Sequence, residues 1–145
     1  MRVLLFAGLL GCASHQPPQV EFLNPGTVLP PGLPFSEAVR VDHTLYLSGM
    51  VGVTPGTAEL VAGGIEAESR RTMENIQMTL EAHGASMEDV VKCTVMLADI
   101  SEWSTFNQVY QTYFTDPYPA RSALGASGLA LGARVEVECI AVVGE

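Results

Sequence analysis

The segment from residue 134 to 143 constrains the fold of this 145-residue chain more than any other. Successive side chains of a β-strand point to opposite faces of its sheet. One set here is wholly apolar, and the other mixes two glutamates with apolar side chains. The first set is Val135, Val137, Cys139, Ala141 and Val143, and the second is Glu136, Glu138, Ile140 and Val142. Because neither face is uniformly polar, we expect both faces of this strand to be covered.

The rest of the chain supplies two helices for that purpose. Apolar residues recur at helical spacing from Ile65 to His83, and an aromatic stripe from Trp103 to Tyr113 follows Ser101 as N-cap. We expect the aromatic stripe to pack in the core. β-prone runs occupy residues 36–41, 45–50, 89–97, 121–126 and 134–143, and the loop-rich stretch 51–64 has room for one short edge strand.

This order of elements predicts the α+β class, with one mixed sheet and both helices packed on one of its faces. The length of the chain suits a single hydrophobic core. The second face of the sheet then needs a different cover. In so small a chain, we expect another copy of the same chain to provide it.

The first twelve residues have the composition of an export signal. Arg2 is followed by a short apolar run, well below the roughly 20 residues that a membrane-spanning helix needs. Residues 9–12 (LLGC) resemble the lipobox of bacterial lipoproteins, in which the chain is cut before the cysteine and lipid is attached to its thiol. We therefore expect residues 1–11 to be a signal peptide and Cys12 to anchor the protein in the cell envelope. An unprocessed cytoplasmic protein is the alternative.

Prolines dominate the stretch that follows. Six of the nine prolines lie between residues 13 and 34, where there is almost no charge. Such a composition favours extended, semi-rigid backbone. We expect residues 12–34 to be a tether and residues 35–145 to form the folded domain.

Charge and residue usage argue against several functions. Seven Lys and Arg against sixteen Asp and Glu give a net charge of −9, which disfavours nucleic acid as a partner. His15, His43 and His83 are far apart in the sequence, so we expect no metal site. Cys93 and Cys139 both fall on expected strands. We expect them to be buried, unreactive thiols, with a disulfide in an oxidising compartment as the alternative.

The last two expected strands carry a candidate site for a small carboxylic acid. Arg121 begins a strand directly after a proline-rich turn, and arginine binds a carboxylate through two hydrogen bonds. Glu136 and Glu138 share a face of the next strand, where burial beside apolar residues would raise the pKa of a carboxyl group. An arginine and a glutamate at a subunit boundary are suited to bind such an acid and act on it. An ordinary structural ion pair is the alternative.

Seven short motifs follow one another along residues 34–143. They are 35–41 (FSEAVRV), 45–49 (LYLSG), 73–76 (MENI), 89–95 (DVVKCTV), 107–110 (NQVY), 119–122 (PARS) and 135–138 (VEVE). In this order they resemble the RidA/YjgF family of enamine and imine deaminases. The resemblance implies a chorismate-mutase-like α+β fold, a homotrimer with three clefts between subunits, and chemistry without a metal or organic cofactor.

The resemblance also implies roles for single residues. Arg121 matches the arginine that grips the substrate carboxylate. Glu136 matches the residue that positions or activates the attacking water. Ser48 and Gly49 match a pair that lines the pocket, and Asn107 matches an asparagine near it on the second helix.

Two positions depart from the family pattern. Phe35 stands where typical deaminases carry a tyrosine, and Ala123 stands where many carry a cysteine. The resemblance implies hydrolytic deamination of small 2-imino acids and their enamines to 2-keto acids and ammonia. The departures keep a second hypothesis open, an envelope-anchored trimer that binds a small carboxylate or a protein partner without turnover. A ribonuclease activity, sometimes attributed to this family, conflicts with the charge of −9.

Overall fold

The computed structural model describes residues 16–144, so the signal-like segment and Cys12 lie outside the described residues. One seven-stranded sheet has the strand order β1-β2-β3-β7-β5-β6, and the short β4 also pairs with β7. All paired strands are antiparallel except β5 and β6. The elements are β1 (Val20–Leu23), β2 (Ala38–Val41), β3 (Thr44–Leu47), β4 (Met50–Val51), α1 (Gly64–Ala82), η1 (Met87–Asp89), β5 (Val90–Leu97), η2 (Ile100–Glu102), α2 (Trp103–Tyr110), β6 (Ala120–Gly125), η3 (Ala130–Gly132) and β7 (Val135–Val142).

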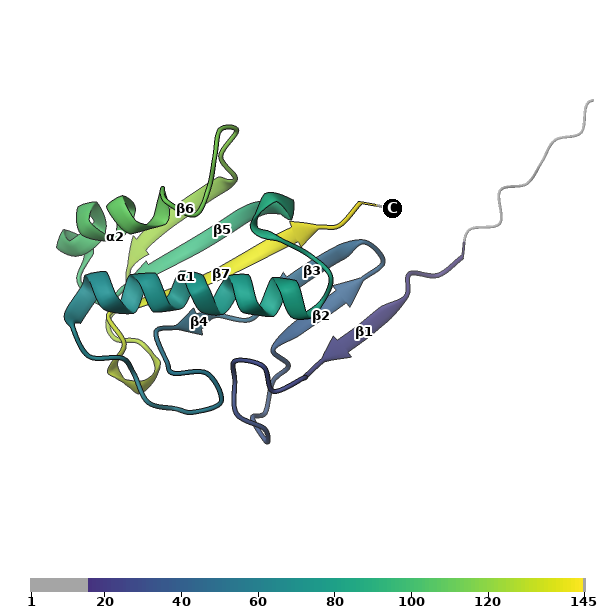
Figure 1. Ribbon diagram of the computed structural model, residues 1–145, viewed down its shortest axis with the longest axis horizontal. Helices are drawn as coiled ribbons and strands as arrows, with labels where there is room; N and C mark the ends of the chain where they lie inside the picture. The colour runs from purple at the N-terminus through teal and green to yellow at the C-terminus, as the bar shows by residue number, and fades with distance from the viewer. Residues whose placement is uncertain (1–15, 145) are drawn as a thin grey trace, which may run out of the picture.

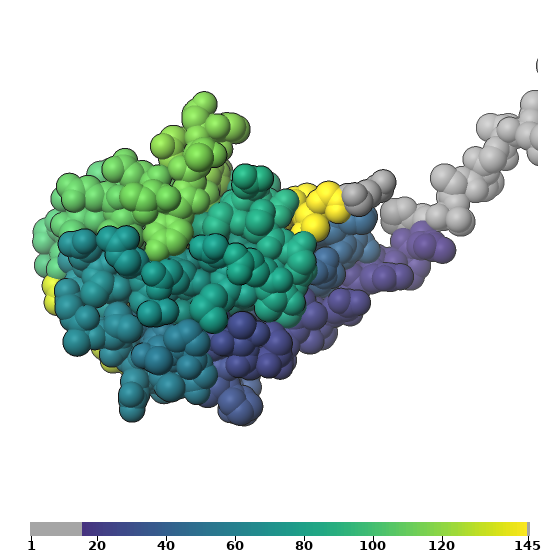
Figure 2. Space-filling model, in the orientation of Figure 1, coloured from purple at the N-terminus to yellow at the C-terminus, as the bar shows by residue number. Residues whose placement is uncertain are grey.

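Both α-helices lie on the same face of the sheet, which confirms the predicted α+β arrangement. α1 crosses the middle of the sheet and α2 lies near β6 (Figure 1). From this side most of the yellow C-terminal segment is covered by the rest of the molecule (Figure 2). The core between the layers includes Met73, Ile76 and Leu80 of α1 and Phe106 of α2. None of the described helices is long and apolar enough to cross a membrane.

The alternation along β7 is also confirmed. Val135 and Val137 are completely buried beneath the helices, whereas Glu136 is half-buried on the opposite face. The same opposite face exposes large apolar side chains in the neighbouring strands. Tyr46 is 47% exposed, and Phe22, which lies in the same cross-strand row, is 72% exposed. This second face is therefore an apolar surface that the described chain leaves uncovered.

The folded domain begins earlier than the sequence indicated. Residues 20–23 form β1, with Val20 opposite Val41 and Leu23 opposite Ala38, and Val28 is fully buried. The prediction that residues 12–34 are a tether is therefore wrong from Val20 onward. Prolines interrupt every periodic pattern in this stretch, so its strand and its buried residue depend on contacts with distant parts of the chain.

Glu37 provides the most important of these contacts. Its side chain is buried, with 2% of the residue exposed. One carboxylate oxygen accepts hydrogen bonds from the backbone N–H groups of Val28 (3.3 Å) and Leu29 (3.0 Å). The other accepts a hydrogen bond from the hydroxyl of Thr79 in α1 (3.1 Å). The proline-rich segment is thereby fastened to the helix layer.

The two strand cysteines form a disulfide that joins β5 to β7. Cys93 lies directly opposite Cys139 in the antiparallel register, 46 residues away in sequence. The prediction of two buried thiols is therefore wrong. Sequence alone does not show which residues of two distant strands lie opposite each other, because the register is set by the packing of the whole sheet.

The start of the second helix differs from the prediction. The N-cap of α2 is Glu102, not Ser101. Asp99 caps the turn η2 before it, since its carboxylate accepts hydrogen bonds from the N–H (2.9 Å) and the hydroxyl (2.7 Å) of Ser101. These hydrogen bonds hold the pKa of Asp99 below its usual value. A 3₁₀ turn therefore precedes α2, which begins at Trp103.

Replacing Glu37 tests how much the buried carboxylate contributes. Glu37→Gln should lower the free energy of unfolding by about 1 kcal/mol, because the neutral amide oxygen of glutamine accepts the N–H groups of residues 28 and 29 more weakly than a carboxylate does. Urea denaturation followed by circular dichroism measures this change. Glu59→Gln, at an exposed loop glutamate, is the matched control. Equal losses in both variants would contradict the assignment.

Candidate functional site

A cleft of about 470 Å³ opens beside Glu136, and we call it the Glu136 cleft. Its walls come from three segments, residues 29–35, 48–58 and 130–131, with Glu136 supplied by β7. Four of the residues predicted from the sequence line it together, namely Phe35, Ser48, Gly49 and Glu136. The structure therefore brings one half of the predicted site together.

Gly49 allows the Glu136 carboxylate to lie against the backbone. A Cβ atom at position 49 would stand 2.0 Å from Oε1 of Glu136, well inside any contact distance. Beside it, the Ser48 hydroxyl donates to the carbonyl of Ser36 (2.6 Å), which fixes the connection between β3 and β4. The Ser48-Gly49 pair thus shapes the pocket through packing and backbone hydrogen bonds.

The pKa of Glu136 is raised above its usual value. Burial is the main cause, because it disfavours the charged carboxylate, and the negative charge of Glu138 adds to it. A carboxyl group of this kind holds a proton more readily than an exposed glutamate. It is suited to accept a proton from water and return it to a leaving group.

A second hollow of about 430 Å³ lies over α2 and the start of β6, and we call it the Arg121 groove. Asn107, Tyr110 and Arg121 are among the residues that line it. The guanidinium of Arg121 stacks 4.5 Å from the ring centroid of Tyr110 and 5.6 Å from that of Trp103. Its Nη1 atom is buried and has no hydrogen-bond partner among residues 16–144. The two rings therefore fix the position of the Arg121 guanidinium, and its Nη1 can still donate a hydrogen bond to a carboxylate.

Arg121 and Glu136 lie on opposite faces of the sheet. In the register, Arg121 pairs with Cys93, whose side chain faces the helices. Glu136 pairs with Met96, three residues further along β5 and on the other face. The structure therefore does not bring the two residues together within one chain. Ala123 shares the face of Arg121 but lines neither the cleft nor the groove.

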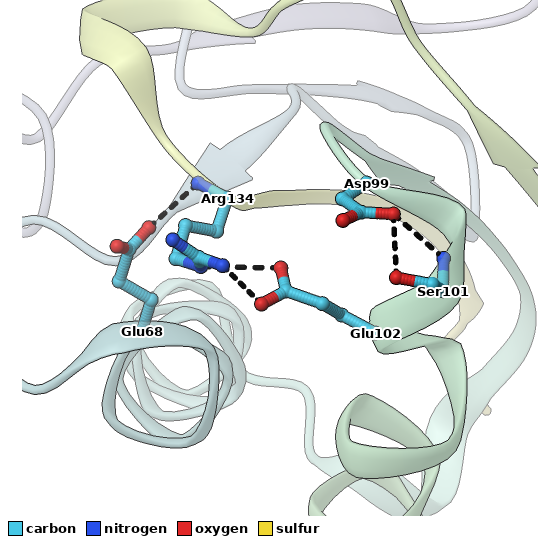
Figure 3. A network of polar contacts seen from close by, with 5 residues as sticks. All are labelled: Glu68, Asp99, Ser101, Glu102 and Arg134. Carbon is cyan, nitrogen blue, oxygen red and sulfur yellow. Dashed lines mark hydrogen bonds and ion pairs between the residues drawn. The ribbon is translucent and has the colours of Figure 1, made fainter.

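A polar network fixes the chain directly before β7 (Figure 3). The backbone N–H of Arg134 donates to the carboxylate of Glu68 in α1 (2.8 Å), and its guanidinium pairs with Glu102 (Nε to Oε2, 3.1 Å). Glu102 belongs to η2, so the network joins both helical regions to the start of β7. It holds Glu136, two residues further on, and the adjoining wall of the Glu136 cleft.

Sequence reasoning missed part of this site. Tyr110 is a core residue, as predicted, but Trp103 is 40% exposed, and both rings flank Arg121. Their spacing of seven residues places them on one side of α2, and this was the available signal. Burial raises the pKa of the Tyr110 hydroxyl, which stays neutral beside the arginine. Glu37, which positions Leu29 in the cleft wall, carried no signal of its own in the sequence.

Gly49→Ala tests the close approach of Glu136 to the backbone. The new methyl group must displace the Glu136 carboxylate, so we expect kcat/KM to fall on the order of 100-fold. Steady-state kinetics measures this loss, and circular dichroism should show that the fold is retained. Only the end of a flexible side chain has to move. Gly144→Ala is the control, because a Cβ there meets no atom within 4 Å. Full activity in Gly49→Ala would contradict the role given to this contact.

Comparison with known proteins identifies the family. The family model described as Endoribonuclease L-PSP matches residues 27–143. The chain is 45% identical over 111 residues to the 2-iminobutanoate/2-iminopropanoate deaminase of Mus musculus, covering 77% of this chain and 82% of that protein. The crystal structure of RidA from an Antarctic Psychrobacter is 36% identical, with a TM-score of 0.79 over 85% of this chain and 99% of that chain. That of E. coli TdcF with bound serine is 28% identical, with a TM-score of 0.77 over 86% and 99%. The chain therefore belongs to the RidA/YjgF family.

Proposed function

We propose that this protein hydrolyses small reactive 2-imino acids, and the enamines that are their tautomers, to 2-keto acids and ammonia. The observation that carries the proposal is the pair of half-sites, an arginine whose Nη1 has no hydrogen-bond partner among residues 16–144 and a glutamate of raised pKa. The mouse relative is named for this activity, and the relative TdcF has a serine bound in its crystal structure. Both support a substrate that carries a carboxylate.

The chemistry follows from the two side chains. Arg121 binds the substrate carboxylate, and Glu136 takes a proton from water while the water oxygen attacks the imine carbon. The nitrogen of the tetrahedral intermediate then receives a proton. The C–N bond breaks, and the nitrogen leaves as ammonia. The balance is R–C(=NH₂⁺)–COO⁻ plus water giving R–CO–COO⁻ plus NH₄⁺. No step in this sequence requires a metal or an organic cofactor.

We infer that the working unit is a homotrimer with sites between subunits. Glu136 and Arg121 lie on opposite faces of the sheet, so a substrate bound to one chain cannot contact both side chains of that chain. β6 is an edge strand whose residues are mostly exposed, and the second face of the sheet is apolar. Both features favour contact with neighbouring copies. A cleft would then combine Glu136 of one protomer with Arg121 of the partner subunit.

The deaminase proposal is tested by timing keto-acid formation when another enzyme releases a 2-imino acid. The wild type should accelerate hydrolysis, and Arg121→Ala should lower kcat/KM by at least about 100-fold, because the substrate carboxylate loses its charged hydrogen-bond partner. Arg70→Ala removes an exposed α1 arginine that pairs with Glu66 and serves as the control. Absence of acceleration by the wild type, or an unaffected Arg121→Ala variant, would overturn the proposal.

Mixing two inactive variants tests the shared site within the same assay. Arg121→Ala retains Glu136, and Glu136→Gln retains Arg121. After equal amounts of the two are unfolded and refolded together, about a quarter of the clefts between subunits combine both native residues. Activity should return to roughly that fraction of the wild-type value. No recovery in mixed trimers would place both residues of each site in one chain.

The raised pKa of Glu136 predicts the pH dependence of the reaction. Glu136 must be deprotonated to accept a proton, so kcat/KM should rise with pH through a pKa above that of an ordinary glutamate. Glu138→Gln removes a neighbouring negative charge, which lowers the pKa of Glu136 and moves this limb to lower pH. Glu88→Gln, at a distant exposed glutamate, should leave the profile unchanged. If Glu138→Gln does not shift the pH at which kcat/KM rises, the assignment of this rise to Glu136 is contradicted.

Binding without turnover is the second candidate function, and Phe35 is the observation that favours it. Phe35 lines the Glu136 cleft and offers no hydroxyl to a substrate. This candidate predicts calorimetric binding of a small carboxylate that depends on Arg121, with no ammonia released from an imino acid. The timed assay above distinguishes the two functions.

We also propose that the protein works in the cell envelope, held there by lipid on Cys12. The signal-like first eleven residues support this, and so does the disulfide between Cys93 and Cys139, because disulfides persist in oxidising compartments. A palmitate analogue fed to producing cells should label the wild type and not Cys12→Ser. Label in both variants, or in neither, would reject the anchor.

A further inference from the structure

Away from Glu136, the walls of the Glu136 cleft are almost entirely apolar. Leu29, Leu33 and Phe35 come from the segment before β2, Val51 and Val53 from β4 and the residues after it, and Leu131 from the segment before β7. Among the described residues that line the cleft, only Ser48, Thr57 and Glu136 have polar side chains. The cleft thus presents one carboxylate and a broad apolar wall to a ligand.

The two hydroxyl groups in the cleft are already engaged with backbone. Ser48 donates to the carbonyl of Ser36 (2.6 Å). Thr57 donates to the carbonyl of Thr54 (2.8 Å) and accepts from the N–H of Glu59 (3.1 Å). A polar ligand group placed against this wall would lose its hydrogen bonds to water and gain few in return. The wall therefore favours an apolar side chain.

Leu131, at the edge of the cleft, combines an unfavourable backbone conformation with an exposed apolar side chain. Its backbone lies in the left-handed region, with φ of 59°, and the residue is 58% exposed. Bulky side chains rarely adopt this conformation. The contacts of Arg134 with Glu68 and Glu102 fix the chain three residues after Leu131 (Figure 3). An exposed leucine on strained backbone at the edge of a cleft indicates a contact with something that the described chain does not supply.

We propose that the Glu136 cleft selects 2-imino acids with a large aliphatic or aromatic side chain, such as those derived from leucine and phenylalanine. This inference rests on the proposed deaminase function and names its substrate class. The mouse relative is named for imino acids whose side chains are methyl and ethyl groups. A cleft of about 470 Å³ lies in the range that holds much larger ligands. Leu33 and Leu131 contact the far end of the side chain.

The chemistry of such substrates also specifies their source. β-Elimination of water from serine or threonine yields only enamines with a one-carbon or two-carbon side chain. Larger 2-imino acids arise when the bond between Cα and nitrogen of an amino acid is oxidised. That step releases two electrons and two protons, and an oxidase or dehydrogenase passes the electrons to its own acceptor. The reaction that feeds this protein is therefore an amino acid oxidation.

A substrate series tests the selection. An amino acid oxidase with catalase releases imino acids from alanine, leucine, phenylalanine and, as a polar control, glutamine. Semicarbazide then traps the imine that escapes hydrolysis. We expect kcat/KM for the leucine and phenylalanine products to exceed that for the alanine product by about tenfold or more, since each buried methylene contributes roughly fourfold. The glutamine product should show no such gain.

The possible outcomes separate the two proposals. Acceleration of the alanine or glutamine product equal to that of the leucine product would overturn the inference and leave the deaminase function standing. No acceleration of any product would overturn the function itself.

Variants locate the selecting residues. Leu33→Ser with Leu131→Ser should lower the ratio of leucine to alanine activity roughly tenfold. Leu131→Gly, which suits the left-handed backbone and so protects folding, should lower the same ratio. Ile100→Ser removes a similarly exposed apolar side chain that lines neither the cleft nor the Arg121 groove. The ratio should not change in that control, and an unchanged ratio in the cleft variants would contradict the assignment.

Discussion

The buried carboxylate of Glu37 connects the parts of the molecule on which the Glu136 cleft depends. Its side chain binds the backbone of residues 28 and 29 and the hydroxyl of Thr79 in α1. Its own carbonyl accepts the N–H of Ser48 (3.1 Å), next to Gly49. One residue thereby sets the position of two cleft walls relative to the helix layer. Hydrogen bonds from three donors make the burial of this carboxylate tolerable.

The alternation of side chains along the strands has the largest consequence for function. It places Arg121 beside the aromatic rings of α2, on one face of the sheet, and Glu136 on the opposite face. The chain therefore carries these two side chains on different faces of its sheet. The same alternation leaves Phe22 and Tyr46 exposed on the second face. The apolar surface and the divided site both favour an assembly of several chains.

The environment of Glu136 favours chemistry at some expense of stability. Burial and the charge of Glu138 raise the pKa of this carboxyl above its value in the unfolded chain. The folded state therefore binds protons more strongly, and the contribution of Glu136 to stability falls as pH rises through this interval. Leu131 is a second residue that costs stability, because its backbone lies in the left-handed region, which disfavours a bulky side chain. Both lie at the same cleft, where local strain commonly serves function.

Periodicity and motifs in the sequence determined the fold class, the two helices on one face and the two faces of β7, and they pointed to Arg121 and Glu136 as candidate site residues. These features depend on local spacing, which the sequence contains directly. The tertiary structure alone decided that residues 20–34 belong to the domain, that Cys93 pairs with Cys139, and that the two half-sites lie on opposite faces. All three depend on contacts made only in the folded chain. The hydrogen bonds of Glu37 fasten residues 28 and 29 to α1. The register of β5 with β6 and β7 decides the other two, and register is fixed only when the whole core packs.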